Sequence, residues 1–187
     1  MTRTVAEVLV GPGTMYTADE NEPIPSDPAT APGANWLEIG YSEAGWSFVA
    51  DRTFERVRAA EEIDPLKTFK TEQELHIRGT SLQASLANLR LALGGGAIVS
   101  DAGPPETDTY TPPGSDEFTA WACLLRVQAP QTATAGTEMR DFYFPKVISI
   151  GAIDMPHDKA PQVSVIAMDF EANKPDTGDI FTIVELT

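Results

Sequence analysis

The amino-acid sequence predicts a mainly β fold, a β-sandwich or barrel with one flanking α-helix. Short segments rich in aromatic and β-branched residues recur along the chain and are separated by turns that contain glycine and proline. Only one segment spaces its apolar residues as a helix does. A length of 187 residues is typical of one domain, so we expect a single domain over residues 1–187.

Extended segments dominate the first half of the chain. Aromatic and β-branched residues are concentrated in residues 36–41 and 46–49, and the intervening residues 42–45 predict a hairpin turn. Residues 7–16 and 53–61 are expected to form further strands.

Residues 66–78 alternate apolar and polar side chains, as a half-buried strand does. The apolar residues Phe69, Leu75 and Ile77 are expected on the face toward the core. The opposite face is expected to meet bulk or enclosed water, and it would carry Lys70, Glu72, Glu74 and His76.

Residues 80–93 are the one predicted helix. Thr80 is placed to cap its N-terminus, Gln83 would complete a capping box, and the glycines at 94–96 would end the helix. The spacing of four leucines predicts an apolar stripe that packs on a sheet, formed by Leu82, Leu86, Leu89 and Leu93.

Two proline-rich acidic segments, residues 18–35 and 101–115, are expected to be extended loops because neither has a periodic apolar face. We expect the first of them to be mobile in a free subunit. The rest of the second half predicts strands, at residues 118–128, 138–150, 162–171 and 180–186.

The charge balance argues against a protein that reads nucleic acid. Lys and Arg total 13 against 28 Asp and Glu, and the resulting net charge of −15 repels phosphate backbones. The single cysteine, Cys123, allows neither an intrachain disulfide nor a cysteine-based zinc site. No apolar stretch approaches the roughly 18 residues that cross a bilayer, and no signal peptide is expected. We therefore expect a soluble chain made in a reducing compartment.

No catalytic residue, metal site or cofactor is predicted. Residues 176–178 spell the Asp-Thr-Gly triplet of aspartic proteases, but they lie between two predicted strands, where Asp and Gly favour a turn. Cys123 with His76 or His157 has the residue types of a cysteine hydrolase. The apolar neighbours of Cys123 instead predict a small buried side chain.

Three further patterns have structural interpretations. The glycines at 94–96 follow a predicted helix, whereas a phosphate-binding loop precedes one. His157 and the adjacent Asp158 lack metal-ligand spacing and are expected to face solvent. The one basic cluster is flanked by Glu55, Glu61 and Glu62, which predicts surface or intersubunit ion pairs; it consists of Arg52, Arg56 and Arg58.

The first half of the chain resembles a known family. Residues 8–16 (VLVGPGTMY) are followed by the acidic loop, by residues 36–48 (WLEIGYSEAGWSF), by strands through Arg78 and by the helix that includes residues 81–89 (SLQASLANL). In this order, residues 5–95 resemble the major tail tube proteins of long, non-contractile-tailed bacteriophages. The likeness is to the group that opens with a Gly-Pro-Gly strand and a Trp…Gly-Tyr…Gly hairpin.

The resemblance implies a structural virion protein rather than an enzyme. Such subunits form hexameric rings that stack into the tail tube, and long hairpins pair side by side in an inner β-barrel around the lumen through which DNA is ejected. The implied partners are further copies of the chain, tail proteins such as the tape measure and terminator, and passing DNA without specific binding. No membrane is involved.

The resemblance also implies a location and a candidate surface. The chain would be made in the cytoplasm of the host bacterium and reside in the virion tail. If residues 66–78 belong to the inner hairpin, the side chains that line the lumen are expected to be Lys70, Glu72, Glu74 and His76.

Two other classes of protein are compatible with the sequence. One is a different phage ring protein, such as a tail terminator, or a secretion-system tube protein of related fold; a ring that never stacks would favour the terminator. The other is a monomeric ligand-binding or enzymatic β-barrel, which needs a pocket with convergent polar groups. A chain that stays monomeric would favour this second class.

Overall fold

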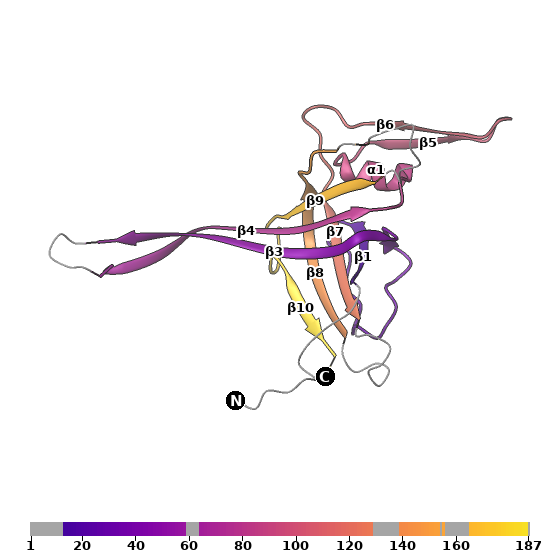
Figure 1. Cartoon of the computed structure of the whole chain (residues 1–187). Coiled ribbons are helices and arrows are strands. Elements are labelled where there is room, and N and C mark those ends of the chain that lie inside the picture. The colour runs from indigo at the N-terminus through magenta and orange to yellow at the C-terminus, as the bar shows by residue number, and fades with distance from the viewer. Residues whose placement is uncertain (1–12, 59–63, 129–138, 154, 156–164, 187) are drawn as a thin grey trace.

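The computed structural model describes residues 13–58, 64–128, 139–153, 155 and 165–186 (Figure 1). Within them the chain is mainly β with one short helix, which confirms the predicted fold class. The helix is α1 (Leu86–Ala92), and the strands are β1 (Gly13–Asp19), β2 (Leu37–Glu38), β3 (Ser42–Val57), β4 (Lys67–Ser81), β5 (Ala97–Asp101), β6 (Thr107–Thr111), β7 (Trp121–Gln128), β8 (Met139–Ser149), β9 (Ile166–Ala172) and β10 (Thr182–Glu185).

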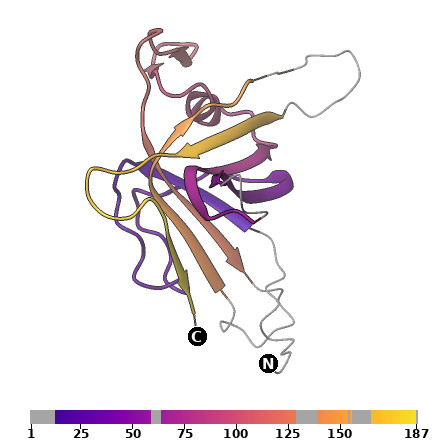
Figure 2. The ribbon, with the colours of Figure 1, turned by 90° about the vertical axis from the view of Figure 1, so that its left-hand side faces the viewer.

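One antiparallel sheet holds eight of these strands. Its order is β2-β1-β7-β8-β9-β4-β3, and β10 pairs with β8 off this path. β5 and β6 form a separate two-stranded hairpin. Figures 1 and 2 show β3, β4 and β9 running crosswise to β7, β8 and β10, so the sheet bends over itself.

The core lies between the two crossing parts of the sheet. Phe48 of β3 packs 5.8 Å from Phe142 of β8 and 5.7 Å from Phe181, measured between ring centroids. The alternation along β9 buries Ile166, Met168 and Phe170 on one face, as period-2 geometry requires. The burial of these large side chains is the main favourable term that holds the crossing strands together.

Residues 20–35 form a loop without helix or strand, as the sequence predicts, and this loop packs against the sheet. The indole Nε1 of Trp36 donates to the carbonyl of Pro23 over 3.2 Å, and the Tyr143 hydroxyl of β8 donates to the carbonyl of Glu22 over 2.8 Å. We call this segment the strap. The Asn21 N–H also donates to the carbonyl of Pro145 over 2.9 Å, so several backbone groups of the strap bond to the sheet within the subunit.

A buried ion pair anchors the strap. Arg126 of β7 and Asp141 of β8 are 3% and 0% exposed, and the guanidinium donates to both carboxylate oxygens, over 2.8 and 2.7 Å. The hydrogen bonds to Asp141 raise the pKa of Arg126 above its ordinary value. The remaining Nη1 of Arg126 donates to the carbonyl of Thr30 over 2.8 Å. Arg126 and Asp141 therefore join β7 to β8, and Arg126 also joins β7 to the strap.

The helix begins later than the sequence predicts. Thr80 and Ser81 belong to β4, where they pair with β9, and Ser85 caps α1 by accepting a hydrogen bond from the Asn88 backbone N–H. The predicted capping box with Gln83 is therefore wrong. Backbone pairing with β9 holds the segment extended, which a local capping pattern does not reveal.

The buried face of α1 also differs from the leucine stripe. Asn88, Leu91 and Ala92 are buried, whereas Leu93 is 41% exposed. The Asn88 side-chain amide lies 2.9 Å from the carbonyl of Ile39 and is thereby satisfied in the interior. Asn88 can occupy a core position because its side-chain amide donates a hydrogen bond to the backbone between β2 and β3.

The hairpin predicted across residues 36–49 is also wrong. β2 pairs with β1, and β3 pairs with β4, so the two aromatic segments are not partners. Gly40 lies between them with φ +92°, and a Cβ there would collide with the Gln83 side chain. This left-handed residue turns the chain from one edge of the sheet to the other.

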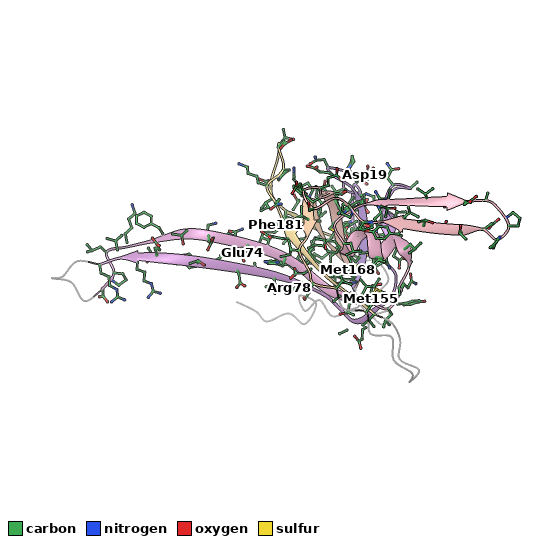
Figure 3. The ribbon with its side chains drawn as sticks, turned by 90° about the horizontal axis from the view of Figure 1, so that it is seen from above. Asp19, Glu74, Arg78, Met155, Met168 and Phe181 are labelled. Atoms are coloured by element: carbon green, nitrogen blue, oxygen red, sulfur yellow. The ribbon has the colours of Figure 1, made fainter. Side chains whose placement is uncertain are left out.

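The segment 101–115 is not an irregular loop. Residues 107–111 form β6, which pairs with β5 from Ala97↔Thr111 to Asp101↔Thr107. Figures 1 and 3 show this hairpin projecting from the body on the side of α1.

Candidate functional site

The feature that sets this fold apart is the length of the β3–β4 hairpin. β3 is the edge strand of the sheet, and only residues 76–81 of β4 pair with β9. The remainder, residues 50–57 of β3 and 67–75 of β4, projects from the body as a two-stranded ribbon (Figures 1 and 3). We call it the outer hairpin. At about 3.3 Å per residue, the eight residues of β3 extend it by roughly 26 Å.

The outer hairpin exposes apolar side chains. Phe54, Val57 and Phe69 are 54%, 50% and 44% exposed. An isolated two-stranded hairpin is marginally stable in water, and its open edges invite pairing with another chain. The described residues provide no third strand for it, so both edges of the outer hairpin are open within the subunit.

The free edge of β3 has peptide groups available for such pairing. The carbonyl of Thr53 accepts a hydrogen bond from the Thr71 hydroxyl of β4, and the carbonyl of Val57 accepts one from the Leu66 N–H. Both carbonyls therefore point toward β4. Because peptide groups alternate in direction along a strand, those of Phe54 and Arg56 point away from β4, toward the open edge.

A β-bulge in β4 decides which side chains share a face. Thr53 pairs with Glu72 and Phe54 pairs with Lys70, so Thr71 is an extra residue without a partner on β3. The extra residue inverts the alternation of β4 beyond it. The Lys70 ammonium accordingly donates to the Gln73 side chain over 2.6 Å, which places these two residues on one face.

One face of the outer hairpin is acidic. Asp51 is directly opposite Glu74, and Thr53 is directly opposite Glu72. Glu55 follows on the same face of β3 because it is two residues beyond Thr53. We define the acidic face by its four carboxylates, which belong to Asp51, Glu55, Glu72 and Glu74.

The opposite face is basic. Period-2 geometry places Arg52, Phe54 and Arg56 on the same side of β3, opposite Gln73, Lys70 and Thr68 of β4. This face continues the side of β4 that enters the core, where Leu75 is 1% exposed. We define the basic face by its three cations and one aromatic ring, which belong to Arg52, Arg56, Lys70 and Phe54.

Two predicted site residues do not lie where the sequence places them. Glu72 and Glu74 are exposed together, but the bulge turns Lys70 to the basic face and Phe69 to the acidic face. His76 is 4% exposed and therefore cannot line an aqueous lumen. The two residues deviate for different reasons: the extra residue Thr71 inverts the alternation at Lys70, whereas His76 keeps the alternation but is covered by Asp169 of β9.

His76 instead joins two strands at the root of the hairpin. Its Nδ1 lies 3.0 Å from one carboxylate oxygen of Asp169 in β9, and Arg78 Nε donates to the other oxygen over 2.7 Å. Asp169 thus bonds two residues of β4. This arrangement fixes the direction in which the outer hairpin leaves the sheet.

The other candidate residues have structural positions. Cys123 is 0% exposed, and burial raises the pKa of its thiol above the ordinary value, so it is inert rather than nucleophilic. Residues 176–178 form an exposed turn between β9 and β10, in which Gly178 has φ +93°. His157 and Asp158 lie outside the described residues.

The glycines at 94–96 end α1 with φ values of +76°, +132° and +93°, as the sequence predicts for a helix stop. Within the described ranges, no group of three His, Cys, Asp or Glu side chains is arranged to hold a metal ion. None of the helices described is long and apolar enough to cross a membrane.

The sequence interpretation missed two features that matter for the site. The first is the pair of opposite faces on the outer hairpin, which depends on a bulge that no glycine or proline marks. The second is the anchoring of the strap by Arg126 and Asp141. Arg126, which follows the apolar run Trp121–Leu125, was the available signal for a buried pair.

Comparison with protein-family models finds no match, and comparison with curated proteins finds none either.

Proposed function

We propose that this chain is a structural virion protein that assembles into stacked hexameric rings and forms the tail tube of a bacteriophage, a conduit for DNA ejection. The observation that carries the proposal is the outer hairpin, a ribbon with two open edges and two charged faces that projects from a folded body. The resemblance of residues 5–95 to major tail tube proteins supplies the architecture in which such a ribbon is used.

Edge-to-edge pairing of outer hairpins would build the inner wall of the ring. Each hairpin offers the free edge of β3 on one side and the free edge of β4 residues 67–75 on the other. Pairing these edges between neighbours satisfies the outward peptide groups of every hairpin, and a closed ring leaves no free edge.

The acidic face is the one that suits a lumen for DNA. Glu72 and Glu74, with Asp51 and Glu55, would present carboxylates to the passing duplex. Like charge limits sticking of the phosphate backbone, and enclosed water solvates the carboxylates. In this arrangement Lys70 and His76 do not line the lumen, for the reasons given above.

The proposed role needs no catalysis and no cofactor. The partners would be further copies of the chain and other tail proteins, such as the tape measure and terminator, and DNA would pass without specific binding. The protein would be made in the cytoplasm of the host bacterium and would reside in the virion tail.

The test is the assembly state of the purified full chain. Sedimentation velocity and negative-stain electron microscopy over a range of concentrations are expected to show rings and tubes with a central channel. A species that remains monomeric at every concentration contradicts the proposal and favours a binding module or enzyme. Rings that never stack favour a terminator instead.

The direction of the acidic face can be measured by thiol labelling. Cys123 is buried, so a Glu72→Cys variant has one accessible thiol among the described residues. A bulky polyethylene-glycol maleimide is expected to label this variant rapidly as dissociated subunits and only from the open ends in assembled tubes. A Lys174→Cys variant, altered in an exposed turn of the body, checks that the reagent is active. Rapid, stoichiometric labelling of Glu72→Cys along intact tubes would place the acidic face outside.

A further inference from the structure

We infer that the basic face of the outer hairpin docks on an acidic groove at the opposite edge of the sheet of a second copy. This inference rests on the proposed function and deepens it, because it names the contact that joins one subunit of a ring to the next.

The basic face has the properties of a contact surface. Phe54 is 54% exposed, and it is flanked on β3 by Arg52 and Arg56. No carboxylate of the described residues lies within ion-pair distance of either arginine. Arginine and aromatic side chains dominate the energetics of protein interfaces, since both combine large contact area with directional bonding.

The body of a second copy has the complementary charge. Residues 42–81 contain six Lys or Arg and eight Asp or Glu, so the rest of the chain carries −13 of the net charge of −15. Several cations of the body are already paired within it, in the bridges Arg126–Asp141, Lys146–Glu20 and Arg140–Glu185. The described residues outside 42–81 contain 16 Asp or Glu and five Lys or Arg, so the unpaired charge on this part of the body is mostly negative.

A groove on that body fits the basic face. It lies between β1, β2 and α1, has a volume of about 380 Å³, and is bordered by the exposed carboxylates of Asp19 and Glu38. Leu37 beside it is 64% exposed. Trp121 lines the groove, Arg90 stacks 5.1 Å over its ring, and the indole Nε1 has no hydrogen-bond partner among the described residues. The two carboxylates of the groove match the two arginines of the basic face, and its apolar side chains match Phe54. The one cation in its lining, Arg90, is held over the Trp121 ring.

The two surfaces lie at opposite ends of the molecule. β3 and β2 are the two ends of the sheet order, and Figures 1 and 3 show the outer hairpin leaving the body on the side away from α1. A contact between different surfaces of successive copies is heterologous, and such contacts close into a ring when the rotation allows it. With its basic face on the neighbour's groove, the hairpin turns its acidic face away from the protein, toward the channel.

The experiment reverses the charges on each surface separately and then recombines them. The hairpin variant is Arg52→Glu with Arg56→Glu, and the groove variant is Asp19→Lys with Glu38→Lys. Each alone is expected to lower the assembled fraction at least about tenfold, because like charges are then brought together at the contact. A 1:1 mixture of the two variants is expected to form rings again, since each hairpin then meets a groove of opposite charge. One chain with all four changes is expected to assemble as well.

Controls separate this contact from folding and from net charge. Circular dichroism and the melting temperature should match those of the unaltered chain for every variant. Asp116→Lys with Asp179→Lys makes the same charge change as the groove variant at other exposed positions, and it is expected to leave assembly intact. If the unaltered chain forms rings but charge reversal leaves them intact, or the mixture fails to restore them, the docking inference is wrong and the proposed function stands. If the unaltered chain forms no rings, both fail.

Discussion

Replacing Asp141 with alanine is expected to lower the free energy of unfolding by about 3–5 kcal/mol, among the largest effects of any single substitution in this chain. The carboxylate is fully buried and accepts two hydrogen bonds from Arg126. Its removal leaves a buried guanidinium without a counter-charge, and the cost of that unpaired charge exceeds the net value of the ion pair itself. Urea denaturation monitored by tryptophan fluorescence measures the change.

Two variants test this explanation. Arg126→Met with Asp141→Leu removes both charges and is expected to recover most of the lost stability, because the unpaired charge is gone. Arg140→Ala breaks a partly exposed pair with Glu185 and is expected to cost less than about 1 kcal/mol. Equal losses for Asp141→Ala and Arg140→Ala would show that burial does not set the energetics of the anchor.

Removing the outer hairpin is expected to abolish ring formation while leaving the body folded. The change replaces residues 53–72 with Asn-Gly, which joins the cross-strand partners Arg52 and Gln73 through a two-residue turn. The described side chains in this range, residues 53–58 and 64–72, are exposed, so the free energy of unfolding is expected to stay within about 0.5 kcal/mol of the original. Sedimentation velocity should then show a monomer at concentrations where the unaltered chain forms rings.

A matched deletion in the second projecting hairpin is the control. Replacing residues 100–108 with Asn-Gly joins Val99 to its partner Thr109 and removes the end of the β5–β6 hairpin. Rings are still expected, because the proposed intersubunit edges belong to β3 and β4. Rings that persist without residues 53–72 would remove the main support for the proposed function.

The sequence by itself determined most of the strand content and the positions of several turns. The alternation in residues 166–172 reports a strand with one face in the core, because side-chain direction repeats every two residues. The glycines at 94–96 and the turn at 176–178 follow from backbone conformations that glycine adopts without strain. An apolar neighbourhood around Cys123 was sufficient to predict an inert, buried thiol.

The tertiary structure alone decided where elements begin and which strands pair. Thr80 has the local pattern of a helix cap, but pairing with β9 keeps it in a strand. Residues 36–41 have the pattern of one strand of a hairpin with residues 46–49, but β2, which lies within them, pairs with β1. Backbone pairing between segments distant in the chain outweighs local preferences worth about 1 kcal/mol or less per residue, and a single sequence does not specify these partners.

In the outer hairpin, too, the sequence determined some features and the tertiary structure decided the others. The polar residues of the 66–78 segment were identifiable from alternation, yet their distribution over two faces depends on one bulged residue, Thr71. His76 has the spacing of an exposed residue, but Asp169 of β9 lies over it and Arg78 shares that carboxylate. A period-2 pattern gives the direction of each side chain relative to its own strand. Insertions in that strand, and the carboxylates that other strands bring beside it, become known only once the sheet is assembled.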